Sequence, residues 1–61
     1  MTIEQMREAI KAECQKRGWS VLDLARASQV SPEAIRRFVN GRGEISPQVR
    51  TRLLKALGLA G

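Results

Sequence analysis

Apolar residues recur every three or four positions along most of the chain, and no stretch shows the two-residue alternation of a β-strand. This spacing predicts helices, because residues three and four apart share one side of a helix. Helical segments are expected over residues 2–17, 20–28, 32–40 and 47–57. The pattern predicts an all-α fold, and a chain of 61 residues suits one domain, residues 1–61, with a small core.

Each segment starts with a residue that can cap a helix. Two starts, at Thr2 and Ser20, have the capping-box pattern, in which an acid or amide follows the cap three residues later. The other two, at Ser31 and Ser46, are Ser-Pro pairs, where serine is expected to cap and proline loses no N–H that the helix needs. Glycines that can end a helix follow three of the segments, at Gly18, Gly41 and Gly58.

One side of each predicted helix is apolar and is expected to face the core. The inward residues are Ile3, Met6, Ala9, Ile10, Cys14, Val21, Leu24, Ala25, Ser28, Ala34, Ile35, Phe38, Val39, Val49, Leu53, Ala56 and Leu57. Val30 is expected to enter the core from the turn before the third helix, and Trp19 to pack over the core edge. Glu13 and Arg17 are spaced to form an ion pair on the first helix.

The third predicted helix, residues 32–40, has a continuous polar side that contains two arginines. Glu33, Arg36, Arg37 and Asn40 are spaced i, i+3, i+4 and i+7, opposite the apolar residues. A helix held by one side and showing arginines on the other suits the major groove of DNA, which is about 12 Å wide. The alternative is an ordinary helix whose charged side is solvated.

The charge is positive and unevenly distributed. The net charge is +5; residues 19–61 contain seven basic and three acidic side chains, whereas residues 1–18 contain four and three. A basic, arginine-rich surface attracts polyanions, because each neutralised phosphate releases counterions. Small domains are often basic, so the charge alone supports nucleic-acid binding and a solvated surface equally.

Little in the sequence indicates catalysis. The chain has no histidine and no tyrosine, and its single cysteine, Cys14, has no visible base and lies on a helix expected to be buried. The sequence shows neither a metal-ligand cluster nor a P-loop glycine pattern. We therefore expect no enzymatic activity, metal or cofactor. With no visible signal peptide or apolar run of membrane-spanning length, a cytoplasmic protein is expected.

Several residues of the segment 20–41 stand in the order of a known motif. They are Leu24-Ala25 in the second helix, Val30-Ser31 at the turn, Ile35 in the third helix and Asn40-Gly41 at its end. This segment resembles the helix-turn-helix of the lambda repressor and Cro-like family of DNA-binding domains. The preceding helix and the stretch from Ser46 to Leu59 also look like that family. The resemblance implies a compact bundle of four to five helices.

Two positions depart from the family's pattern. Gln29 stands where the family usually has glycine at the turn. If the turn is kept, Gln29 is expected in the left-handed conformation, at a cost of about 1 kcal/mol relative to glycine. Pro32 stands where the family often has a polar base-reading residue, so part of the usual set of base contacts is missing.

The resemblance implies that the third helix is the recognition helix and that its N-terminal part enters the major groove. The candidates for base edges are Ser31, Glu33, Arg36 and Arg37. The candidates for phosphates are Ser20, Asn40, Arg42 and Ser46. Glu33 could equally be a first-turn carboxylate that favours the helix dipole. The basic residues of the last helix could extend the phosphate contacts or face solvent; they are Arg50, Arg52 and Lys55.

The expected function is sequence-specific binding of double-stranded DNA by a small transcriptional regulator of the repressor type. Useful affinity would come from two copies on a two-fold operator, as a homodimer or paired by the DNA. The alternative is a small helical protein-interaction module, similar to an antitoxin or an adaptor, that binds an acidic partner. Neither function involves a membrane or a small-molecule substrate.

Overall fold

The computed structural model describes residues 2–59, which form four helices and no strand. The helices are α1 (Ile3–Arg17), α2 (Val21–Ser28), α3 (Pro32–Val39) and α4 (Pro47–Ala56). The all-α prediction is confirmed, and each helix lies within one residue of its expected bounds. The family resemblance implied four to five helices, and residues 2–59 form four.

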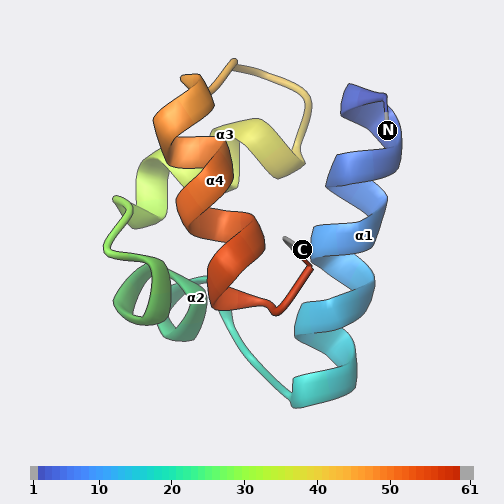
Figure 1. Ribbon diagram of the computed structural model, residues 1–61, viewed down its shortest axis with the longest axis vertical. Coiled ribbons are helices and arrows are strands. Elements are labelled where there is room, and N and C mark those ends of the chain that lie inside the picture. Colours follow the sequence, from blue (N-terminus) through green and yellow to red (C-terminus); the bar gives the residue numbers. More distant parts are fainter. Residues whose placement is uncertain (1, 60–61) are drawn as a thin grey trace.

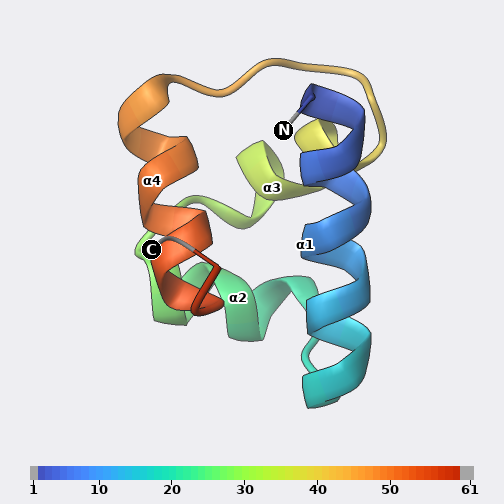
Figure 2. The ribbon, with the colours of Figure 1, turned by 45° about the vertical axis from the view of Figure 1, so that its right-hand side comes forward.

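The helices enclose one core. In Figure 2, α1 and α4 stand on opposite sides, α2 lies across the bottom, and α3 lies between α1 and α4. Helix α2 packs against both α3 and α4, and α1 packs against α3. The connection over residues 40–46 passes over the top of the bundle to reach α4 (Figure 1). Because α3 rests on both α1 and α2, its orientation is set by the rest of the bundle.

The helix starts follow the capping predictions at three of the four positions. Thr2 and Ser20 form complete capping boxes, and the Ser46 hydroxyl accepts a hydrogen bond from the Val49 N–H at 3.2 Å. Ser31 was expected to cap α3, and this expectation is wrong: its side chain forms no capping hydrogen bond. Its ψ is 133°, against 160–175° at the other three caps, and at this angle its hydroxyl forms no bond to the first turn.

The turn between α2 and α3 has the left-handed residue that the sequence predicted. Gln29 has φ 58° and ψ 37°, and it is the only residue other than glycine with a positive φ between residues 2 and 59. The reversal is closed by the Val30 N–H, which donates to the Ala25 carbonyl oxygen at 3.3 Å. Val30 is buried, as expected. The strained conformation at Gln29 is therefore part of the packed turn.

The core is built from the apolar sides of all four helices. Its buried apolar residues are Met6, Ile10, Leu24, Ala25, Val30, Ile35, Phe38, Leu53 and Leu57. All of these were predicted, as was buried Ser28, whose hydroxyl donates to the Leu24 carbonyl oxygen at 2.6 Å. Trp19 packs against the edge of this core, also as predicted.

Ile3 does not face the core as expected. It lies in the first turn of α1 and is 42% exposed, and it lines a hollow together with Phe38 and Ile45. Ile45, in that connection, is partly buried against the core and was not predicted, since an isolated loop residue belongs to no periodic pattern. The upper edge of the core thus differs from the sequence-based expectation.

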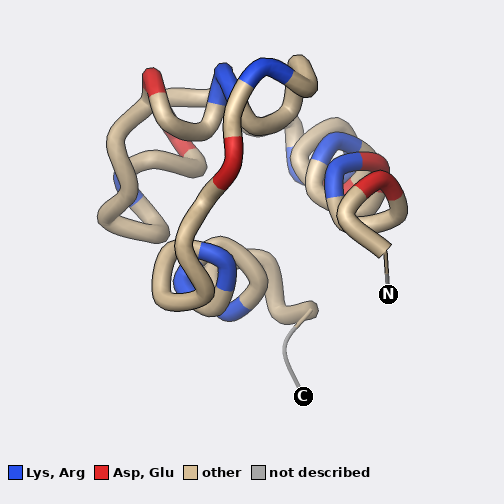
Figure 3. Tube along the Cα trace, turned by 90° about the horizontal axis from the view of Figure 1, so that it is seen from above, with Lys and Arg blue, Asp and Glu red and all other residues tan. Residues whose placement is uncertain are grey.

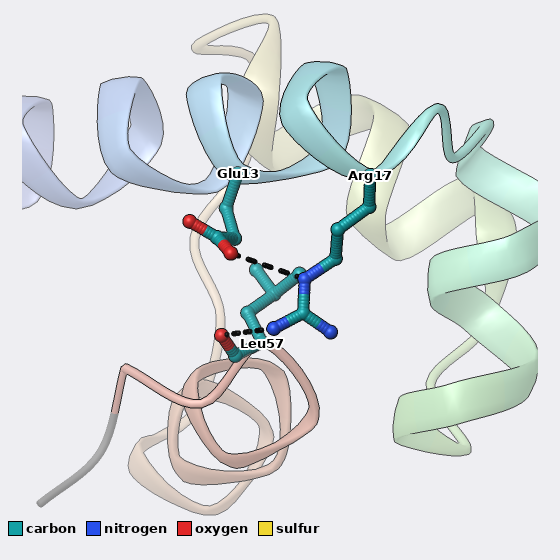
Figure 4. A network of polar contacts seen from close by, with 3 residues as sticks. All are labelled: Glu13, Arg17 and Leu57. Carbon is teal, nitrogen blue, oxygen red and sulfur yellow. Dashed lines mark hydrogen bonds and ion pairs between the residues drawn. The ribbon is translucent and has the colours of Figure 1, made fainter.

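Arg17 joins the end of α1 to the end of α4 (Figure 4). Its Nε donates to the Glu13 carboxylate at 3.1 Å, which confirms the predicted ion pair. The same guanidinium donates to the Leu57 carbonyl oxygen at 2.9 Å and lies 5.0 Å from the centroid of the Trp19 ring. A cation at the carbonyl end of a helix is favourable, because that end carries a partial negative charge.

Candidate nucleic-acid interface

Helix α3 is held by one side and exposed on the other. Ile35 and Phe38 are each only 1% exposed, whereas Glu33, Arg36 and Arg37 are exposed. Asn40, directly after the helix, is exposed as well. The amphipathic arrangement expected from the spacing is therefore present, and the polar side of α3 is open to a ligand.

The four candidates for base contacts all lie on α3 or directly before it. Ser31, Glu33, Arg36 and Arg37 are exposed, and the Ser31 hydroxyl is not used in capping. The ion pairs between residues 2 and 59 are Lys11 with Glu8 and Arg17 with Glu13, so no carboxylate is paired with either arginine of α3. Glu33 lies in the first turn, a position compatible with a base contact and with stabilisation of the helix dipole.

The chain reverses directly after α3 and keeps the next candidates close to it. The Gly41 N–H donates to the Phe38 carbonyl oxygen at 3.0 Å, and the Arg42 N–H donates to the Arg37 carbonyl oxygen at 2.8 Å. Gly41 has φ 74°, which glycine adopts at little cost. The reversal places exposed Asn40 and Arg42 beside the last turn of α3, where they can contact phosphates.

Arg37 extends along the connection that follows α3. A Cβ atom added to Gly43 would lie 3.4 Å from the Arg37 Cβ and 3.6 Å from its Nε. Gly43 does not have a positive φ, so its backbone conformation is one that other residues adopt. A Cβ at this position would be in ordinary van der Waals contact with the Arg37 side chain, so Arg37 lies against the connection that also carries Arg42.

The starts of α2 and α4 differ as anion sites. At Ser20 the backbone N–H donates to the Asp23 carboxylate at 2.9 Å, and this bond lowers the pKa of Asp23 below its ordinary acidic value, which favours the charged form further. A phosphate bound at Ser20 would be repelled by this negatively charged carboxylate. The first turn of α4 contains no acidic residue, so Ser46 is the more favourable of the two predicted helix-start sites.

The basic residues of α4 are separated from those of α3. Seen from above, the basic positions on the two helices lie on opposite sides of the bundle (Figure 3). Arg52 and Lys55 are exposed, while Arg50 is partly buried and its Nε has no hydrogen-bond partner within residues 2–59. The surface of α3 and the loop after it is therefore the candidate interface, and the exposed basic residues of α4 lie outside it.

One residue with a direct contact to α3 has no signal in the sequence. Arg7 on α1 donates from Nε to the Phe38 carbonyl oxygen at 2.7 Å, and its guanidinium lies 5.1 Å from the centroid of the Phe38 ring. The two residues are 31 positions apart. No local pattern could pair them, because the contact depends on how α1 packs against α3.

The described residues offer little for other chemistry. Burial raises the pKa of the Cys14 thiol, which disfavours the reactive thiolate at neutral pH. Residues 2–59 contain no group of three or more possible metal-ligating side chains of the His, Cys, Asp and Glu types. A hollow of about 490 Å³ lies between α1, α3 and the start of α2, and apolar residues that line it include Ile10, Trp19 and Ile35.

None of the helices formed by residues 2–59 is both long enough and apolar enough to span a bilayer.

Comparison with known proteins supports the geometry of α2, α3 and their turn. A family model described as helix-turn-helix matches residues 10–60, most of the chain. No curated protein and no solved structure matches the sequence. The matched family is one of DNA-binding domains typical of transcriptional regulators and is generally non-enzymatic. The chain therefore belongs to the lambda repressor and Cro-like helix-turn-helix family of DNA-binding proteins.

Proposed function

We propose that this protein recognises a specific double-stranded DNA sequence with α3 in the major groove and acts as a small transcriptional regulator of the repressor type. The residues proposed to contact base edges are Ser31, Glu33, Arg36 and Arg37. The residues proposed to contact phosphates are Ser20, Asn40, Arg42 and Ser46. Occupancy of a promoter sequence excludes other proteins from it, so binding alone is sufficient for repression. The proposed location is the cytoplasm, where the protein would reach a chromosome that is not enclosed in a nucleus.

The observation that supports this proposal is the pair of exposed arginines on a helix anchored by Ile35 and Phe38. Eight residues make α3 about 12 Å long, comparable to the width of the major groove. Arginine can donate two hydrogen bonds to O6 and N7 of guanine, and one such pair discriminates between bases by about 1–3 kcal/mol. A packed helix presents these side chains in a defined direction, as sequence recognition requires.

Two copies of the domain suit a two-fold operator. The Cα atoms span 24 × 23 × 19 Å, and side chains add a few ångströms on each side. Half-sites one helical turn apart are separated by about 34–36 Å, so two bound copies would be close to contact. We propose a homodimer or DNA-assisted pairing, in which each copy reads one half-site.

The experiment is selection of binding sites from random duplexes, followed by titration of the selected duplex and a scrambled one by fluorescence anisotropy. We expect the selected duplex to bind more tightly and log K to fall with log salt concentration by about 0.9 per neutralised phosphate. Equal affinity for both duplexes would refute sequence-specific recognition. Absence of duplex binding would instead favour the module that binds an acidic protein.

Alanine variants assign the roles of the two arginines. Arg36→Ala or Arg37→Ala should relax preference at one base pair, with a loss of about 1–3 kcal/mol on the selected duplex and a smaller loss on variants at that position. Arg52→Ala, which removes the same charge from α4, is the matched control and should change affinity little. A uniform loss across all duplexes would reassign the arginine to a phosphate.

A further inference from the structure

Arg7 contacts Phe38 in two ways. Its Nε donates to the Phe38 carbonyl oxygen at 2.7 Å, and its guanidinium lies 5.1 Å from the centroid of the Phe38 ring. Arg7 is partly buried, and the ring it covers is 1% exposed. A charged donor and a carbonyl acceptor form a hydrogen bond stronger than a neutral pair, and the cation also faces the negative end of α3.

The contact acts on the part of α3 that carries the arginines. Phe38 directly follows Arg37 in the chain, and its carbonyl oxygen also accepts the Gly41 N–H at 3.0 Å. Arg7 therefore holds the last turn of α3 and the beginning of the reversal at one atom. The N-terminal end of α3 has no side-chain cap, because the Ser31 hydroxyl forms no capping bond. The bond from Arg7 anchors the C-terminal end of the helix.

Small movements of α3 matter for base contacts. The helix has eight residues and is about 12 Å long, so a tilt of about 10° about one end moves the other end by about 2 Å. Binding groups have to be held to within about 0.5 Å and 10–20° of their productive geometry. Loss of an anchor at Phe38 would thus displace the Arg36 and Arg37 side chains from the base edges, although both side chains remain present.

We infer that Arg7 is a positioning residue for DNA recognition, which fixes the orientation of α3 through the carbonyl oxygen and ring of Phe38. The inference rests on the proposed function, because its consequence is base discrimination. Arg7 itself needs no contact with DNA in this role.

The chain supplies a matched control in Arg17. Arg17 also donates from a guanidinium to a carbonyl oxygen at a helix end, that of Leu57 at 2.9 Å, and also lies over an aromatic ring, that of Trp19 at 5.0 Å. It anchors α4, which carries none of the proposed base contacts. Arg7→Met and Arg17→Met therefore each remove a bond to a carbonyl oxygen at a helix end, a ring contact and one positive charge. Arg17→Met also removes the ion pair with Glu13, so it is the more severe of the two changes, and it affects α4 in place of α3.

The test compares affinities for the selected duplex and for its single-base-pair variants. We expect both methionine variants to melt at a lower temperature than the unmodified protein. Arg7→Met should lower the ratio of affinities about tenfold, within the roughly 5- to 150-fold that one bidentate base contact supplies, while Arg17→Met changes it less than about twofold. Arg7→Lys, which keeps a donor and a charge, should recover part of the ratio.

An unchanged ratio in Arg7→Met, or an equal fall in Arg17→Met, would overturn the inference while the proposed function stands. If Arg7→Met fails to fold, Arg7→Lys carries the comparison, and a ratio equal to that of the unmodified protein with a lowered melting temperature would refute positioning. The two hypotheses are tested by different measurements. In NMR spectra of the free protein, rapid exchange of the Arg7 Nε–H would refute the anchor. In the titrations, equal affinity of the unmodified protein for all duplexes would refute the proposed function.

Discussion

Replacing Gln29 with glycine should stabilise the fold. Gln29 has φ 58° and ψ 37°, a conformation that costs a residue with a Cβ about 1–2 kcal/mol. Glycine removes this strain and adds about 0.4–1 kcal/mol of conformational entropy to the unfolded chain. The Gln29 side chain is exposed and forms no hydrogen bond among residues 2–59, so its loss adds little. The expected net gain is about 0.5–1 kcal/mol.

Thermal unfolding followed by circular dichroism measures this gain. For a domain of 61 residues, 1 kcal/mol corresponds to about 4–8 °C, so the melting temperature should rise by about 2–8 °C. The matched control is Gln15→Gly, the same substitution at an exposed position inside α1, which should lower stability by about 1 kcal/mol. A lower melting temperature for Gln29→Gly would refute the assignment of strain to this turn.

Three further predictions concern single groups. Gly41→Ala should lose about 1 kcal/mol in urea unfolding because of its φ of 74°, whereas Gly43→Ala should be tolerated or slightly stabilising, since its new Cβ would meet Arg37 at contact distance. The pKa of Asp23 is lowered in the fold, so the ionised carboxylate stabilises the protein above about pH 4, and this stabilisation is lost as the pH falls through the folded pKa. Asp23→Asn should therefore weaken the dependence of the melting temperature on acid pH. The raised pKa of Cys14 predicts slow reaction with a disulfide reagent at pH 7 and a rate that still rises above pH 9; a rate that levels off near pH 8 would contradict it.

Local interactions made much of this fold predictable from the sequence. Capping boxes act over three residues and helical periodicity over three or four, so the helix bounds and the inward sides could be inferred without knowing the packing. The left-handed Gln29 was predictable as well, because the resemblance to a known turn placed that conformation at its position. The exposed side of α3, with Arg36 and Arg37, followed from the same periodicity.

The tertiary structure decided the features that depend on how the helices meet. Arg7 contacts Phe38, 31 residues away along the chain, and Arg17 contacts Leu57, 40 residues away. Local residue spacing cannot predict either contact. The exposure of Ile3 and the closeness of Gly43 to Arg37 likewise depend on how segments distant along the chain pack together. Sequence patterns report forces between near neighbours along the chain, whereas the orientation of the recognition helix is set by contacts between distant ones.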